Sequence, residues 1–270
     1  MRDFAKAFEV TGTKPVKLAR FDPGQTGGLK SKKQTLKRFE SNLEALAELQ
    51  YRLYAEGKRS LLIVLQGIDA AGKDGTIRRV FSVFNPQGCP VTAFKVPSRV
   101  ELAHDFLWRV HKAAPPRGAI GIFNRSHYED VLVVRVHGLA PKSVWSRRFA
   151  QINRFEKHLV DNGTTILKFF LVISKDEQKR RFRARLDNPL KNWKFSREDV
   201  EKRKLWGDYL QAIEDAVNRC STPHAPWFVI PADHKWFRNL VISQIVRDTL
   251  ERLDPRVPEV TEDLSDIVIE

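Results

Sequence analysis

The chain has 270 residues, 42% of them hydrophobic and 30% charged, which is the composition of a globular protein with an ample buried core. No apolar run is long enough to span a bilayer and residues 1–6 lack the apolar core of a secretory signal, so we expect a cytoplasmic protein. The formal net charge of +14 indicates a polyanionic partner: nucleic acid, anionic lipid or an inorganic polyanion. Cys89 and Cys220 lack metal-type spacing and fit buried thiols.

The first 59 residues form a predicted N-terminal extension that ends in a helix. Apolar residues at alternating steps of three and four predict this helix at about 32–56, with Gly57 as its C-terminal stop. They are Leu36, Phe39, Leu43, Leu46 and Leu53. Such a helix can pack on its own domain or on a second subunit.

From residue 61 onward, strand and helix patterns alternate along the chain. Apolar runs predict five strands, at 61–65, 91–96, 119–123, 165–173 and 227–230. Helices are predicted between them, at about 98–111, 143–160, from 174 onward and at 197–219, with a last one to about 253. This order implies an α/β fold whose five-stranded parallel sheet is covered by helices on both faces. We expect one domain at 60–255, after the extension at 1–59 and before an acidic tail at 256–270.

The residues after the first strand match the start of a phosphate-binding P-loop. Gly67 and Gly72 allow backbone N–H groups to converge on phosphate at the start of a helix, and Lys73 adds a mobile cationic donor. Asp74 stands where Ser or Thr normally holds magnesium, so the match is incomplete. The expected phosphate-binding residues are Gly67, Ala70, Ala71, Gly72, Lys73, Asp74, Gly75, Thr76 and Arg78. The predicted apolar face of the following helix consists of Ile77, Val80, Phe81 and Phe84.

A polar cluster that begins at Asn124 follows the third strand. Ligands of doubly wound sheets lie beyond the carboxyl ends of the strands, so this cluster should face the P-loop. Asn124 holds the position where P-loop enzymes usually carry a magnesium-binding Asp, and Glu129 and Asp130 come slightly later. With Asp69 and Asp74 these acids would repel polyphosphate unless Mg²⁺ lay between, which argues for a metal. Alternatively, Glu129 and Asp130 merely start the next helix.

A strongly basic segment lies between residues 179 and 204, with 11 basic residues against four acidic ones. It is either a solvated helix face or a mobile lid at about 178–204, as in phosphotransferases of the nucleotide-kinase type. Asn188-Pro189 would break the helix as a lid requires. Arg181 and Arg185 lie four residues apart on one helix face, where both could grip one phosphate chain.

Three motifs of the chain resemble those of the polyphosphate kinase 2 family. They are Gly72-Lys73-Asp74-Gly75, Phe123-Asn124-Arg125-Ser126-His127-Tyr128, and Arg180-Arg181-Phe182 followed by Pro189-Leu190-Lys191-Asn192-Trp193-Lys194. The resemblance covers about residues 30–255. Asn124 followed by Glu129-Asp130 is similar to the class III branch, whose members phosphorylate both AMP and ADP.

The resemblance implies a P-loop kinase-like fold with a basic helical lid on the domain at 60–255. It implies an enzyme that moves the terminal phosphoryl group of inorganic polyphosphate to AMP and ADP, with Mg²⁺ or Mn²⁺, without nucleic acid or membrane, as a homo-oligomer. The implied catalytic residues are Asp69, Lys73, Arg125, Glu129, Asp130, Arg181 and Arg185. The implied nucleotide-binding residues are Asn124, Arg125, His127, Tyr128 and Glu129. Lys191 and Lys194 would bind polyphosphate, and Asp69 and Asp130 the metal.

Two other interpretations remain open at this point. An ATP-dependent nucleotide kinase would normally keep Ser or Thr at position 74, which holds Asp74 here. A nucleic-acid-binding protein could use the basic segment, but the chain has no recognisable nucleic-acid module.

Overall fold

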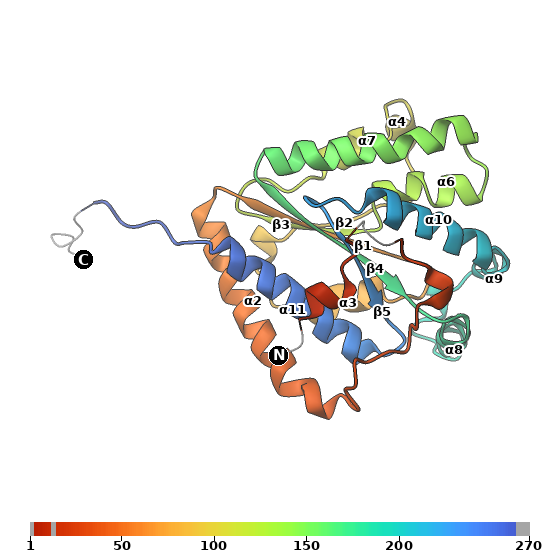
Figure 1. Ribbon diagram of the computed structural model, residues 1–270, viewed down its shortest axis with the longest axis horizontal. Coiled ribbons are helices and arrows are strands. Elements are labelled where there is room, and N and C mark those ends of the chain that lie inside the picture. Colours follow the sequence, from red (N-terminus) through yellow and green to blue (C-terminus); the bar gives the residue numbers. More distant parts are fainter. Residues whose placement is uncertain (1–2, 12–14, 263–270) are drawn as a thin grey trace.

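The computed structural model describes residues 3–11 and 15–262, and the central element is a sheet of five parallel strands (Figure 1). The strands are β1 Ser60–Gly67, β2 Val91–Ala93, β3 Ile120–Asn124, β4 Thr164–Val172 and β5 Trp227–Pro231, in the order β2-β3-β1-β4-β5. Leu65 pairs with Asn124, so the carboxyl ends of β1 and β3 lie side by side. The predicted five-stranded parallel sheet is confirmed.

Helices cover both faces of the sheet (Figure 1). One face carries α1 Phe4–Phe8, α2 Leu36–Glu56, α3 Lys73–Val80 and α11 Lys235–Leu253. The other carries α5 Trp108–Lys112, α6 Val133–Val136, α7 Lys142–Asp161 and α10 Trp206–Cys220. Within β1, Leu61 and Ile63 enter the first core, and Leu62 and Val64 enter the second. The central strand is apolar throughout because both of its faces are buried.

The N-terminal extension packs on the same chain. Phe4 and Phe8 of α1 contact Phe237, and α2 lies along α11 with Gly57 in the left-handed conformation at its end. This agrees with the first of the two predicted arrangements for the helix. Residues 257–262 of the tail are exposed, and the predicted acidic segment continues into 263–270, outside the described residues.

Several predicted elements are shorter or divided. The helix expected at 98–111 is two helices, α4 Arg99–Leu102 and α5, because Asp105 accepts from the Leu107 N–H and starts a new turn. The capping box at Ser98 is present. The helix expected at 197–219 divides at Leu205 into α9 Arg197–Lys204 and α10. Helix α3 ends at Val80, so the buried residues 81 and 84 lie in the turn after it.

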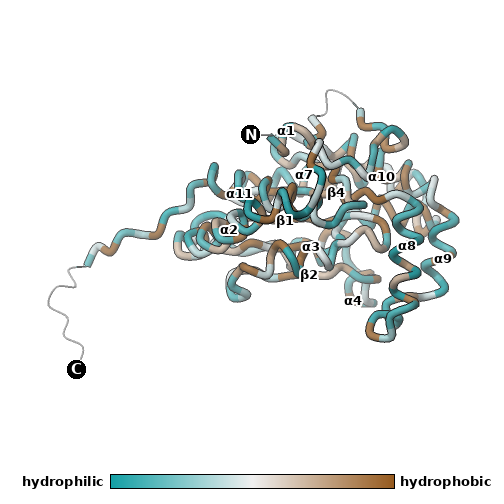
Figure 2. The backbone as a smooth tube through the Cα atoms, turned by 90° about the horizontal axis from the view of Figure 1, so that it is seen from below, coloured by the Kyte–Doolittle hydropathy of each residue, from teal (hydrophilic) through white to brown (hydrophobic). Residues whose placement is uncertain are grey.

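The segment predicted as a lid consists of α8 Lys175–Leu186, a short 3-10 turn Asn192–Lys194, and α9. It lies at the end of the molecule toward which the strands point (Figure 1), and α8 and α9 are mostly hydrophilic along their length (Figure 2). In the part of the chain that the structure describes, no helix is long and apolar enough to cross a membrane.

Candidate phosphate and nucleotide site

The loop between β1 and α3 has the backbone of a P-loop. Gly72 has φ 109° and caps α3, and Ala70 adopts φ 65° although it carries a side chain. The Lys73 Nζ donates to the Gly67 carbonyl at 2.5 Å and lies 3.3 Å from the Ile68 carbonyl. The expected mobile lysine is therefore buried and folded over the loop. Burial, together with the charge of Arg125, lowers the pKa of Lys73 to about 8.

Arg125 joins the P-loop to the end of β3. Its Nη2 donates to Asp69 Oδ1 at 2.7 Å and its Nη1 lies 3.8 Å from Glu129 Oε2. Gln66 on β1 donates to Glu129 Oε1 at 3.0 Å. Burial alone would raise the pKa of Asp69, but the charges of Lys73 and Arg125 outweigh it and lower this pKa. Arg125 also has φ 63°, a strained conformation of the kind that concentrates at functional sites.

The lid reaches the P-loop at Asp74. Asn124 donates to one oxygen of this carboxylate at 2.9 Å, and the Lys194 Nζ lies 3.5 Å from the other. A second connection runs through Gln178, which donates to the Asp69 carbonyl and accepts from Arg203 on α9. The lid residues are thus coupled to the loop by hydrogen bonds and an ion pair.

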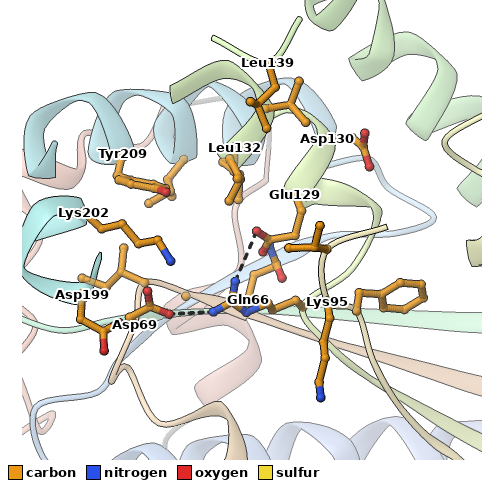
Figure 3. A pocket seen from close by; sticks show the side chains of 18 of the residues that line it. Gln66, Asp69, Lys95, Glu129, Asp130, Leu132, Leu139, Asp199, Lys202 and Tyr209 are labelled. Atoms are coloured by element: carbon orange, nitrogen blue, oxygen red, sulfur yellow. Dashed lines mark hydrogen bonds and ion pairs between the residues drawn. The ribbon is translucent and has the colours of Figure 1, made fainter. Parts of the chain in front are cut away.

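A cavity of about 230 Å³ opens between the P-loop, the turn after β3 and the lid. Its floor is charged, with Asp69, Arg125 and Glu129, and Lys202 of α9 points toward Asp69 (Figure 3). Its apolar wall contains Phe94, Leu132, Val133, Leu139, Trp206 and Ile213. Tyr209 also lines the cavity and bonds to His137 at 2.9 Å; burial and the nearby carboxylates of Glu129 and Asp69 raise its pKa to about 12.

The sequence did not predict this wall. Its residues come from separate segments of the chain and form no motif, although most of them lie near a strand or helix end. Of the residues predicted to bind phosphate, only Gly67 lines the cavity. The loop residues from Ala70 to Thr76, Lys194, and the exposed Arg78 and Lys191 do not.

His127 and Tyr128 do not reach the cavity, which corrects their predicted role in nucleotide binding. Both are buried in the core. His127 Nε2 lies 3.1 Å from Glu156 Oε1, Tyr128 donates to the same oxygen at 2.8 Å, and Lys168 donates to Tyr128. The motif around Arg125 therefore combines residues that face the site with residues that anchor the turn from below.

Asp130 is also placed differently from the prediction. Its carboxylate accepts from Arg148 at 2.9 Å and lies beyond Glu129 as seen from Asp69 (Figure 3). Burial raises its pKa, and Arg148 offsets this only in part. Among the residues the structure describes, no three acidic, histidine or cysteine side chains gather as ligands of one metal. Asp69 and Asp130, the two residues predicted to hold a metal, both line the cavity, but Glu129 lies between them (Figure 3).

Arg181 and Arg185 do not act as a pair. Arg181 is buried, bonds to Glu177, and donates to the carbonyls of Ala70 and Ala71 at 2.8 and 3.0 Å. It supports the loop from outside instead of gripping a phosphate chain. Arg185 is half-buried beside Phe182, and its charge contributes to the lowered pKa of Asp69, but it does not line the cavity.

The parallel sheet, the loop after β1 and the cationic segment at the strand ends define a P-loop protein with a kinase-like fold. A family model described as "Polyphosphate kinase 2 (PPK2)" matches residues 29–258. The chain therefore belongs to the polyphosphate kinase 2 family.

The relatives agree in sequence and in structure over almost the whole chain. The AMP/ADP-polyphosphate phosphotransferase of Meiothermus ruber is 51% identical, over 98% of this chain and 100% of the relative. The ADP-polyphosphate phosphotransferase of Rhodopseudomonas palustris is 44% identical, over 97% of this chain and 94% of the relative. The crystal structure of polyphosphate kinase 2 from Arthrobacter aurescens superposes with a TM-score of 0.94 at 43% identity, covering 98% of this chain and 94% of that one.

Proposed function

We propose that this chain transfers the terminal phosphoryl group of inorganic polyphosphate to AMP and to ADP, giving ADP and ATP. The observation that carries the proposal is that P-loop residues, the Arg125–Glu129 turn and the lid line one cavity with a charged floor and an apolar wall. The names of the relatives from Meiothermus and Rhodopseudomonas support the same substrates.

The nucleotide would enter with its base against the apolar wall and its phosphate toward Arg125. Apolar pockets with a few convergent polar groups are the usual form of such sites. Leu132 and Leu139 would pack on the base, while Arg125 and Glu129 would meet the phosphate end. An oxygen of that phosphate attacks the terminal phosphorus of polyphosphate, and the bond to the next phosphate breaks. The nucleotide gains one phosphate and the polyphosphate loses one.

The donor chain would lie between the P-loop and the lid at about 178–204. Lys73 would leave the carbonyls that it contacts and bind the phosphates around the transferred group. Arg185, Lys191 and Lys194 would neutralise the chain from the lid side, and Asp69 would orient the acceptor. Phosphoryl transfer depends mainly on positioning and charge neutralisation, so no nucleophilic side chain is required.

A divalent metal fits the floor of the cavity. Asp69 is an ionised carboxylate and Glu129 shares the Arg125 contact with it, so two oxygen ligands lie at the place where phosphates would complete the shell. This is the donor set that Mg²⁺ prefers, with Mn²⁺ as an alternative. The ion, when bound, neutralises and orients the phosphates. Asp130 is left out of this set because its carboxylate lies beyond Glu129 as seen from Asp69 (Figure 3).

The test is an assay with AMP, long-chain polyphosphate and Mg²⁺ in the absence of ATP. We expect ADP and then ATP to form, and excess EDTA to stop the reaction. The control reaction replaces polyphosphate with ATP, which an ATP-dependent nucleotide kinase would use. No transfer from polyphosphate, or transfer only from ATP, would refute the proposal.

We also propose that the chain divides into an extension at 1–59, a catalytic domain at 60–255 and a tail at 256–270, and that it forms a homo-oligomer. The exposed Tyr51 and Tyr54 on α2 support an interface there. Light scattering after gel filtration tests the oligomer: a monomeric mass would contradict it.

A further inference from the structure

Arg238 lies behind the P-loop and has no role in the proposed function so far. It is the fourth residue of α11 and only 2% exposed. Its Nη1 contacts the Ala71 carbonyl at 3.3 Å, and Asn239 Oδ1 accepts from its Nη2 at 2.8 Å. Asn239 therefore fixes the direction of the guanidinium toward the loop.

Two glycines of the loop leave the space that this arginine occupies. A Cβ at Gly72 would overlap Arg238 Nη1, and one at Gly75 would lie 3.6 Å from Nη2. The guanidinium therefore packs directly on two glycines of the P-loop. The Ala71 carbonyl receives a second guanidinium, that of Arg181, at 3.0 Å. The same peptide unit carries the Gly72 N–H, one of the groups that a P-loop aims at phosphate.

The charge of Arg238 has no counter-charge among the residues that the structure describes. Glu177 pairs with Arg181, but no carboxylate in the described part of the chain forms an ion pair with Arg238. Burial and the neighbouring Arg181 lower the pKa of Arg238 to about 9, so it remains a cation at neutral pH. A buried cation without a counter-charge destabilises the folded protein, since no ion pair offsets the free energy of its desolvation.

We propose that Arg238 is a positioning residue for phosphate: it holds the peptide between Ala71 and Gly72 in place and supplies a positive charge that a phosphate in the loop balances. The low dielectric of the buried side strengthens this attraction across the loop. Without a ligand the protein thus carries an uncompensated buried charge, and it is stabilised when a phosphate chain binds. The inference rests on the proposed function only for the identity of the substrate.

The test uses Arg238→Met with Arg247→Met as the matched control. Arg247 lies on the same helix and pairs with Glu251 away from the loop. Thermal unfolding is measured with and without tripolyphosphate, without nucleotide or metal, and tripolyphosphate binding is measured by calorimetry. We expect Arg238→Met to unfold at the same or a higher temperature than the parent when empty. Its affinity for tripolyphosphate should fall by about tenfold or more. Arg247→Met should bind like the parent.

A second variant, Arg238→Lys, keeps the charge and loses the planar fork, so it should recover part of the affinity. Unchanged tripolyphosphate binding by Arg238→Met would overturn the proposal. So would a large loss of stability or failure to fold, because a purely structural arginine predicts that result. These readouts need no turnover, so they remain valid even if the parent transfers no phosphate from polyphosphate.

Discussion

Two clusters of buried charge lie on opposite faces of the sheet, and they differ in the balance of positive and negative groups. The core cluster consists of Glu156, Lys168, His127 and Tyr128. The P-loop cluster consists of Glu177, Arg181 and Arg238. In the core cluster Lys168 donates to Glu156, Tyr128 and the Cys220 carbonyl, so its charge is matched and its hydrogens are used. The P-loop cluster has two guanidinium groups and one carboxylate, and both guanidinium groups contact the phosphate-binding loop.

The difference separates two uses of buried charge. A matched pair holds the fold together, and in the core cluster it anchors the turn that carries Arg125 and Glu129. Although burial alone would raise it, the pKa of Glu156 is lowered by the charge of Lys168 and by the hydrogen bond with His127, as expected for an ion pair. An unmatched cation beside a loop instead destabilises the empty protein, and an anionic ligand that balances its charge therefore binds more tightly. Variants in the core cluster should therefore change stability first, and variants around the P-loop should change binding and turnover first.

The largest expected effect is on stability, from Glu156→Leu. Removing one partner leaves Lys168 buried without a counter-charge, which costs about 3–5 kcal/mol of the free energy of unfolding. Urea unfolding measures this loss. The double variant Glu156→Leu/Lys168→Met removes both charges and should recover much of it. A single variant as stable as the parent would mean that the core cluster contributes nothing to the fold, and the comparison would fail.

Next in size is the loss of turnover in Lys73→Ala. Lys73 is buried and donates to the Gly67 carbonyl, so the variant will lose some stability, unlike a surface lysine. The main effect should be on turnover, which should fall by about a hundredfold or more because the variant lacks a phosphate ligand. The measurement is the rate of ADP formation from AMP and polyphosphate, divided by the folded fraction from circular dichroism. Near-parent turnover per folded molecule would remove Lys73 from the site.

The sequence predicted the parts of the site that are local in the chain. The strand, the loop and the start of α3 follow one another within residues 60–80, and hydrogen bonds within this segment determine its form. The coupling of the end of β3 to the loop was also predictable, because neighbouring parallel strands bring their carboxyl ends together. This reasoning placed the polar cluster that begins at Asn124 beside the loop, where Arg125 contacts Asp69 and Glu129.

The predictions that failed concern residues whose partners lie far away in the chain. The buried Tyr128 accepts from Lys168, 40 residues later, and the buried Arg181 donates to Ala70 across 111 residues. A sequence motif gives the residue types but does not say which of its side chains face the site and which are buried in the core. Arg238 was missed for the same reason: an isolated arginine in an apolar helix reads as a surface residue until the loop is placed against it.

The third effect is the pH dependence that Lys73 confers. As the pH rises, its deprotonation should stabilise the folded state and weaken phosphate binding. Burial lowers the pKa of Lys73 from 10.5 to about 8, so the unfolded chain holds this proton more tightly. Between those two values the folded state gains stability as the pH rises. Phosphate binding needs the protonated amine, so kcat/KM for polyphosphate should fall about thirtyfold between pH 7 and pH 9.5. Lys73→Ala provides the control, since its remaining activity should lose this pH dependence. A flat parent profile would contradict the assignment.

The smallest expected effect separates the choice of acceptor from catalysis. Glu129 accepts from Gln66 and lies near Arg125, at the place where AMP and ADP would present their phosphates. AMP must reach the donor with one phosphate and ADP with two, so a carboxylate that orders the shorter acceptor affects AMP more. In Glu129→Asn the charge and one methylene are lost, and AMP phosphorylation should fall by about tenfold, near 1.4 kcal/mol, with a smaller loss for ADP. Glu129→Gln keeps the length and the contact with Gln66, so it isolates the charge. Rates with both acceptors are compared at matched polyphosphate and Mg²⁺. Equal losses for the two would assign Glu129 to general catalysis or folding.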